Sequence, residues 1–144
     1  MSLRVFLDAN VLFSASNTGS NIATLMESLS ERGTGISSHL AVEEARRNIE
    51  LKRPQWLTGF ERVRATLQLV PAARFPLPVT LDAKDAPLLC AAVGAKCDYF
   101  VTGDKRDFGH LDGQTVLGVQ VISVLRLAQL LAARNREGST TEDP

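Results

Sequence analysis

Strand-like runs alternate with segments of helical periodicity along almost the whole chain, and no other feature constrains the fold as strongly. Short, mostly apolar runs predict buried strands at 3–7, 35–38, 67–70, 99–102 and 119–122. Apolar residues spaced three and four apart predict helices over 20–32, 40–52, 56–66, 82–94 and 124–134. Because strands and helices take turns, the sequence predicts an α/β fold in which helices cover both faces of a parallel sheet.

The composition is that of one globular domain. The chain has 144 residues, of which 44% are hydrophobic and 22% charged. We expect residues 1–135 to form the domain and the polar segment 136–144 to be a disordered tail. The cysteines, Cys90 and Cys97, have no disulfide-like pattern, so free thiols are expected. With no signal-like leader and no apolar run near ~20 residues, the sequence predicts a cytoplasmic protein without a membrane span.

Acidic residues stand where the predicted strands end or where the next helix begins. Asp8 follows the first predicted strand, and Asp104 follows the fourth. Asp85 lies in the first turn of the helix that leads into the fourth strand, and Glu43 and Glu44 begin the helix after the second. Because ligands of an open α/β sheet bind beyond the carboxyl ends of its strands, these acids are expected to converge at one edge.

Several carboxylates that lie close together repel one another, and a bound cation relieves this repulsion. Mg²⁺ and Mn²⁺ prefer carboxylate oxygens and water as ligands. Such a cluster is suited to phosphodiester hydrolysis, because the metal activates a water and stabilises the developing charge. Each acid alone is more typical of a turn or a helix cap than of a metal site. Four of them at strand ends favour a metal site.

Four segments resemble the motifs of PIN-domain proteins. Residues 7–12 (LDANVL) are similar to the opening motif, and residues 38–48 (SHLAVEEARRN) to the second, a helix that carries an acid. Residues 85–92 (DAPLLCAA) resemble the third motif, and residues 100–108 (FVTGDKRDF) resemble the fourth, which is the most specific. The order and spacing of these motifs fit the family across nearly the whole chain.

The resemblance implies a three-layer α/β/α domain with a central five-stranded parallel sheet. It also implies a Mg²⁺- or Mn²⁺-dependent endoribonuclease that hydrolyses RNA. Many members of the family are toxins of bacterial toxin–antitoxin pairs, inhibited by a small antitoxin, and they are often dimers. The resemblance therefore predicts an RNA substrate, an antitoxin partner and a homodimer.

The resemblance also assigns the metal ligands. They would be the motif acids Asp8, Glu44, Asp85 and Asp104, bound directly or through water, with Asp107 as a weaker fifth acid. Glu43 competes with Glu44 for the second position. We prefer Glu44, because Ala45 and Ile49 then face inward and Glu44 lies beside the buried stripe of its helix.

Two further groups of residues are assigned to the site. Asn10 and Thr102 would orient the ligands by hydrogen bonding, and Lys105, Arg106 and Arg47 would contact RNA phosphates. The 16 Lys and Arg residues balance 16 Asp and Glu residues, so the formal net charge is zero. Nucleic-acid-binding proteins are usually basic, so RNA binding would have to depend on a local patch or on bound cations.

Two alternatives were weighed against the nuclease. A phosphatase of the haloacid dehalogenase type also begins with an acid after a strand. Such enzymes need a second acid two residues later, where this chain has Asn10. The other alternative is a catalytically inactive PIN-like module that binds RNA or protein. Loss of ligand carboxylates would indicate such a module, and the sequence retains all four.

Overall fold

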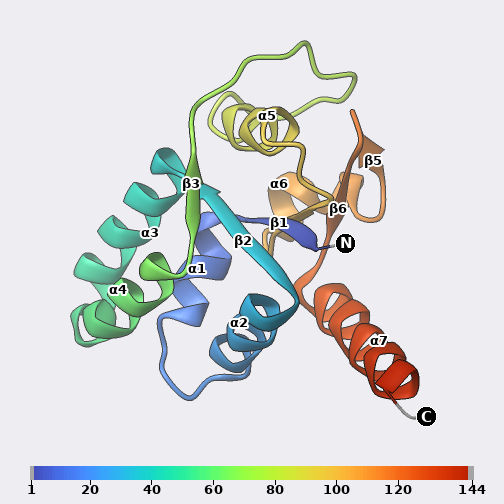
Figure 1. Ribbon diagram of the computed structural model, residues 1–144. Helices are drawn as coiled ribbons and strands as arrows, with labels where there is room; N and C mark the ends of the chain where they lie inside the picture. Colours follow the sequence, from blue (N-terminus) through green and yellow to red (C-terminus); the bar gives the residue numbers. More distant parts are fainter. Residues whose placement is uncertain (1, 143–144) are drawn as a thin grey trace.

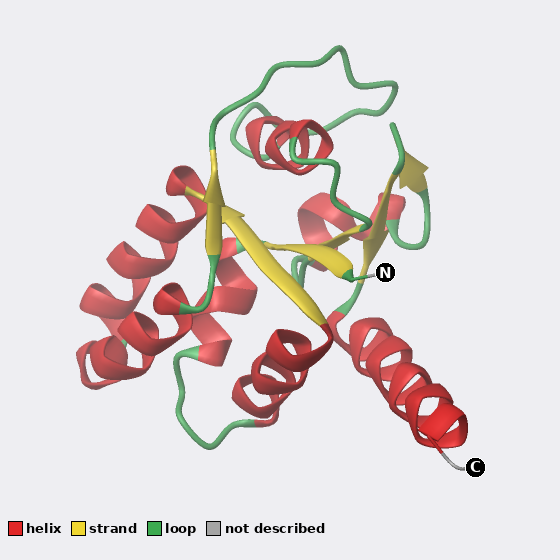
Figure 2. Cartoon of the chain, in the orientation of Figure 1, coloured by secondary structure: helices red, strands yellow, loops and turns green. Residues whose placement is uncertain are grey.

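A six-stranded sheet forms the middle layer of the domain, with the strand order β3-β2-β1-β4-β6-β5. The computed structural model describes residues 2–142 (Figures 1 and 2). The strands are β1 (Leu3–Leu7), β2 (Gly33–Ser38), β3 (Gln68–Val70), β4 (Tyr99–Val101), β5 (Thr115–Val116) and β6 (Val119–Ile122). The predicted α/β fold and its three layers are confirmed.

The predicted number of five strands is wrong by one short strand. The strands β3, β2, β1, β4 and β6 are parallel, as predicted, but β5 pairs with β6 in the antiparallel direction. The two are joined by Leu117 and Gly118, which both have positive φ angles, of 49° and 91°. Two such residues in succession are typical of a tight hairpin turn. A strand of two residues has no periodicity, so the sequence pattern did not reveal it.

Helices cover both faces of the sheet. They are α1 (Ala9–Ala15), α2 (Asn21–Arg32), α3 (His39–Lys52), α4 (Leu57–Ala65), α5 (Ala86–Gly94), α6 (Lys105–Phe108) and α7 (Val124–Glu142), with 3₁₀ turns η1 (Pro54–Trp56) and η2 (Gly109–Leu111). The path from β1 to β3 runs in one direction across the sheet, and the step from β3 to β4 reverses it. Because such crossovers are right-handed, α5 lies on the face opposite to α1–α4 (Figure 1).

The predicted helices are present, with shifted ends. The helix predicted over 82–94 begins only at Ala86, because residues 82–85 form a turn. The short helices α1 and α6 were not predicted. Helix α7 continues past residue 135 to Glu142, and the proposed division of the chain at that residue stays a prediction. Residues 143–144 of the expected tail lie outside the described part.

Three phenylalanines connect the strands that carry the candidate site. The Phe6 ring of β1 stacks on Phe100 of β4 with 5.3 Å between ring centroids, and Phe100 contacts Phe108 of α6 at 5.0 Å. All three side chains are fully buried. Aromatic packing of this kind stabilises the structure beyond the area that it buries. It fixes the ends of β1 and β4 relative to α6.

Cys90 and Cys97 are buried and carry free thiols. Among the described helices, none combines the length and apolarity that crossing a lipid bilayer requires.

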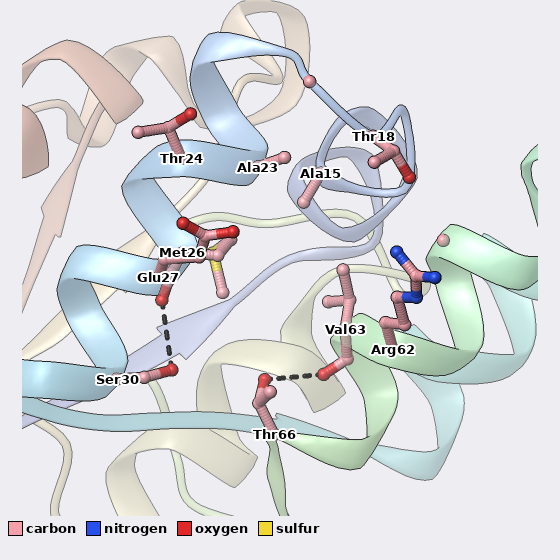
Figure 3. Close-up of a pocket in the computed structure, with 12 residues that line it drawn as sticks. Ala15, Thr18, Ala23, Thr24, Met26, Glu27, Ser30, Arg62, Val63 and Thr66 are labelled. Atoms are coloured by element: carbon pink, nitrogen blue, oxygen red, sulfur yellow. Dashed lines mark hydrogen bonds between the residues drawn. The ribbon is translucent and has the colours of Figure 1, made fainter.

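Helices α1, α2 and α4 pack closely around a cavity of about 260 Å³ (Figure 3). Gly59 of α4 lies against the last turn of α1, where a Cβ atom would overlap the carbonyl oxygen of Ser16. Glycine is therefore required at this crossing because the two backbones meet without room for a side chain.

We predict that Gly59→Ala lowers the free energy of unfolding by about 1–3 kcal/mol, since overpacking forces the two helices apart. Urea unfolding followed by circular dichroism measures the change. Gly109→Ala is the matched control, because its nearest neighbour beyond the local chain is Lys105 Cβ at 4.0 Å. Equal stability of the two variants would contradict the predicted close contact.

Candidate metal centre

Asp8 lies at the carboxyl end of β1, the strand that separates β2 and β3 on one side of the sheet from β4, β6 and β5 on the other. Its side chain is only 3% exposed. Oδ1 accepts a hydrogen bond from the Ala9 backbone N–H at 2.8 Å and so caps helix α1, while Oδ2 accepts one from Thr102 Oγ1 at 2.8 Å. Asp8 therefore occupies the position where open α/β sheets bind their ligands.

Thr102 and Asn10 form a closed hydrogen-bond network around Asp8. The Thr102 hydroxyl donates to Asp8 and accepts from the Asp104 backbone N–H at 3.0 Å and from Asn10 Nδ2 at 3.3 Å. Asn10 Nδ2 also donates to Asp8 Oδ2 at 3.1 Å, and Asn10 Oδ1 accepts from the Gly103 N–H at 2.7 Å. Because each group uses its donors and acceptors in one way, the carboxylate of Asp8 is held in one orientation.

Asp104 and Asp107 are placed by the first turn of α6. Asp104 caps this helix by accepting a hydrogen bond from the Asp107 N–H at 3.0 Å. The Asp107 carboxylate forms an ion pair with Lys84, whose Nζ lies 3.1 Å from Oδ2. The fourth motif thus presents two acids on one short turn, directly after β4.

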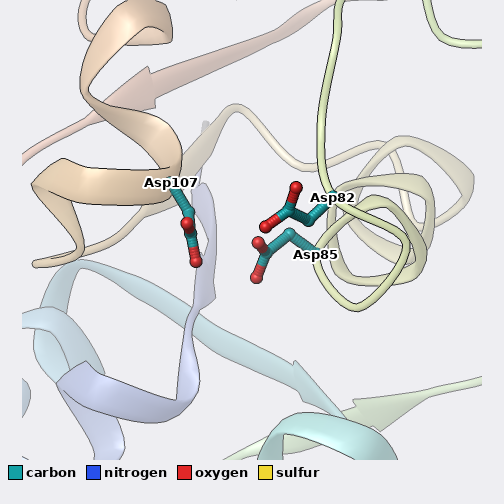
Figure 4. A group of neighbouring side chains, drawn as sticks. All are labelled: Asp82, Asp85 and Asp107. Carbon is teal, nitrogen blue, oxygen red and sulfur yellow. The ribbon is translucent and has the colours of Figure 1, made fainter.

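The closest group of carboxylates consists of Asp82, Asp85 and Asp107, and we call it the acid cluster. One oxygen from each residue lies within 4.8 Å of those of the other two (Figure 4). Asp85 is 7% exposed, and no described residue donates a hydrogen bond to its buried Oδ2. An oxygen of this kind is costly to bury unless it gains a proton or a cation.

The electrostatic interactions connect this cluster to the other motif acids. Burial raises the pKa of Asp8, the hydrogen bonds from Thr102 and Ala9 oppose the shift, and the charges of Glu44 and Asp104 raise it further. The acids that the sequence assigned to the site therefore act on one another, although Asp8, Glu44 and Asp104 are not members of the acid cluster of the described chain.

Within the cluster, two neighbouring carboxyl groups are shifted in opposite directions. Burial, followed by the charge of Asp107 and a hydrogen bond with it, raises the pKa of Asp85 to about 6. The hydrogen bond from Lys84 lowers the pKa of Asp107. Two carboxyl groups form a hydrogen bond only when one of them carries a proton, and these opposite shifts assign that proton to Asp85 below about pH 6.

Glu43 and Glu44 differ in their electrostatic effect on the site. Both side chains are exposed, while Ala45 and Ile49 are fully buried, as expected. The charge of Glu44 raises the pKa of Asp8, so Glu44 lies toward the site. Its role as a ligand stays a prediction.

The sequence did not single out two residues of the site, Asp82 and Lys84. Asp82 precedes Asp85 by three residues, so that the turn before α5 brings their side chains together. This spacing was a usable signal. The ion pair between Lys84 and Asp107 joins segments far apart in the sequence and left no local signal.

The residues present fit a hard divalent cation. The donors are carboxylate oxygens, which Mg²⁺ and Mn²⁺ prefer, and one of them is buried without a donor of its own among the described residues. Asp82, Asp85 and Asp107 could hold the ion directly. The charge of Asp8 acts on Asp85, and the charges of Glu44 and Asp104 act in turn on Asp8.

The cationic residues assigned to RNA differ in their surroundings. Lys105, Arg106 and Arg47 are exposed. Lys105 also lines a groove of about 560 Å³ that continues past Thr102 at the ends of β4 and β6. The cavity shown in Figure 3 is lined by no member of the acid cluster and carries no comparable chemistry.

Comparisons with known proteins agree with this architecture. The family model described as PIN domain matches residues 4–106. The fold is similar to that of VapBC2 from Rickettsia felis, solved bound to a DNA fragment from its promoter, with a TM-score of 0.60, 12% identity, and coverage of 83% of this chain and 97% of that one. It is also similar to PAE2754 from Pyrobaculum aerophilum, with a TM-score of 0.57, 19% identity, and coverage of 92% and 99%. No curated protein sequence matches significantly.

We predict that Asp85→Asn stabilises the metal-free protein at pH 7. The native state holds a proton on Asp85 more tightly than the unfolded chain does, so its stability falls as the pH rises from the ordinary pKa of 3.8 to about 6. The amide avoids this loss and can donate to Asp107. In EDTA the melting temperature of the variant should exceed that of the native protein by about 3 °C or more at pH 7, and by less at pH 5.

The control for this measurement is Asp112→Asn, which changes an exposed aspartate. It should leave the melting temperature and its pH dependence unaltered. An Asp85→Asn protein that melts below the native protein at pH 7 would contradict the raised pKa of Asp85.

Proposed function

This chain belongs to the PIN-domain family, and on that basis we propose that it is a metal-dependent endoribonuclease that hydrolyses phosphodiester bonds in RNA. One observation supports the proposal above the others. The carboxylate of Asp85 lies beside those of Asp82 and Asp107, and its buried Oδ2 receives no hydrogen bond from any described group. A site built in this way is suited to a divalent cation rather than to a structural network.

The proposed mechanism assigns different tasks to the acids. Mg²⁺ or Mn²⁺, when bound, supplies an activated water and charge stabilisation for the phosphate. Asp8, Glu44, Asp85 and Asp104, with Asp107, are the proposed ligands, directly or through water. Asn10 and Thr102 keep the Asp8 carboxylate in one orientation by their hydrogen bonds.

Positive charge for RNA binding is proposed to be local. Lys105 lines the groove beside Thr102, and Arg106 follows it on the same exposed turn. Arg47 lies one helical turn after Glu43, to whose carbonyl its Nε donates at 3.4 Å. These residues would bind RNA phosphates on either side of the acids. The zero net charge of the chain does not by itself predict such binding.

The partners and location of the protein are part of the same proposal. The VapBC2 neighbour was solved with a promoter fragment of DNA, and we infer by analogy that this chain is the toxin of a toxin–antitoxin pair. A protein antitoxin would then inhibit it. The proposal also includes a homodimer, by analogy with the family, and the cytoplasmic location that the sequence predicts.

The phosphatase and the inactive binding module are not equally supported as alternatives. Membership of the PIN-domain family argues against a phosphatase of the haloacid dehalogenase type. A catalytically inactive PIN-like module that binds RNA or protein remains the second candidate, and the zero net charge is the feature that favours it. Thermal unfolding with and without Mn²⁺ separates the two, because a functional site is stabilised by the ion it binds.

We predict that the protein cleaves single-stranded or structured RNA in Mg²⁺ or Mn²⁺ and that EDTA abolishes the reaction. Asp8→Asn and Asp104→Asn should each lower the cleavage rate by at least about 100-fold. Both residues cap helices, and asparagine caps helices equally well, so the fold should persist. Gel analysis of labelled RNA measures the loss. The control is Glu50→Gln, an exposed acid further along α3.

Retained turnover in either purified aspartate variant would refute the assignment of that residue, and cleavage in EDTA would refute the metal-dependent mechanism.

A second prediction distinguishes the two glutamates of the second motif. Glu44→Gln should lower cleavage strongly, whereas Glu43→Gln should change it by less than about threefold, because the charge of Glu44 acts on Asp8. Initial rates at saturating Mn²⁺ compare two variants of the same chemistry on adjacent residues. The reverse order of effects would transfer the ligand role to Glu43.

A further inference from the structure

We propose that Asp82 is a cation ligand, and that the loop between β3 and α5 therefore carries a metal-binding group outside the four family motifs. The inference rests on the proposed function in that it concerns the same metal centre. It extends the site to a residue that the motif acids do not include.

The first step is the geometry of the acid cluster. Figure 4 shows the side chains of Asp82 and Asp85 directed toward Asp107, and one oxygen of each lies within 4.8 Å of the others. Asp82 and Asp85 come from the turn that precedes α5, while Asp107 comes from α6. Side chains from separate elements thus meet at a distance that one cation can bridge.

The second step is an independent sign of a ligand. Asp85 is 93% buried, since the residue is 7% exposed. Its side chain is directed toward Asp107, and no donor in residues 2–142 reaches its buried Oδ2. Lys84, the nearby ammonium group, is directed to Asp107 Oδ2 at 3.1 Å instead. The single positive charge of Lys84 neutralises only part of the negative charge of three carboxylates, and a divalent cation would neutralise the rest.

The third step is the fixed position of the loop. The carbonyl oxygen of Asp82 accepts hydrogen bonds from the backbone N–H of Asp85 at 2.9 Å and of Ala86 at 3.0 Å. On the other side, Nε2 of His110 donates to the carbonyl oxygen of Thr80 at 2.8 Å. The loop is thereby tied both to α5 and to η2, the turn that directly follows α6. Asp82 is held in place by its backbone, which leaves its carboxylate free to bind.

The exposures of the three acids suit a hydrated ion. Asp85 is buried, Asp107 is half-buried and Asp82 is exposed. A cation bound by all three would keep an open side toward solvent, where Mg²⁺ and Mn²⁺ retain water molecules. Asp82 supplies the outermost ligand and would close the site on the side of the loop.

The test is Mn²⁺ binding to the metal-free, full-length protein, followed by the electron paramagnetic resonance signal of free Mn²⁺. Asp82→Asn should weaken binding by at least about tenfold, while the exposed control Asp112→Asn should stay within about twofold of the native protein. Asp82→Ser provides a second variant that lacks the carboxylate. Melting temperatures in EDTA verify that each variant is folded.

The inference is overturned if folded Asp82→Asn or Asp82→Ser binds Mn²⁺ as tightly as the native protein, or if the native protein binds none. The RNA cleavage assay separates this outcome from the fate of the proposed function. Weakened Mn²⁺ binding in the variants without any RNA cleavage by the native protein supports the ligand role and contradicts the nuclease. The opposite result is unchanged Mn²⁺ binding in the variants, together with RNA cleavage by the native protein that requires both metal and Asp8. It contradicts the ligand role of Asp82 and supports the nuclease.

Discussion

The burial of two carboxylates, Asp8 and Asp85, is the constraint on which the site depends. Burial is the largest cause of the raised pKa of each, and neighbouring acids add to it. The chain compensates Asp8 with hydrogen bonds from Thr102, Asn10 and the first N–H of α1. It leaves Asp85 Oδ2 without a donor in the described structure. This asymmetry is the observation on which the proposed cation site rests.

Aromatic packing between β1, β4 and α6 and the hydrogen-bonded turn after β4 hold these acids in place. The stacked rings of Phe6 and Phe100, with Phe108 against them, fix β1, β4 and α6 relative to one another. The segment after β4 then serves several purposes at once. The hydroxyl of Thr102 orients Asp8, and Asp104 caps α6, while Asp107 from the same turn reaches the acid cluster. A change that removes the hydrogen bonds of Thr102 or Asp104 therefore affects both the fold of the turn and the placement of a carboxylate.

The zero net charge of the chain is compatible with such a site because the charges are distributed unevenly. The acids gather at the carboxyl edge of the sheet, and Lys84 neutralises one of them directly. Arg46, by contrast, is engaged away from the edge, where it pairs with Glu61 at 3.1 Å and lies over the ring of Phe60. Exposed Lys105, Arg106 and Arg47 remain available to phosphates. The balance of a whole sequence is thus a poor guide to its partners.

The sequence by itself determined the alternation of strands and helices, the parallel strands, and the order of the motif acids, because periodicity and capping are local properties of the chain. It missed β5, α1 and α6, which are too short to show a period. Only the tertiary structure decided that Asp82 joins Asp85 and Asp107, and that Lys84 pairs with Asp107 rather than with another acid. These contacts depend on how the loop after β3 lies beside the turn after β4, which strand register and packing fix and residue spacing does not.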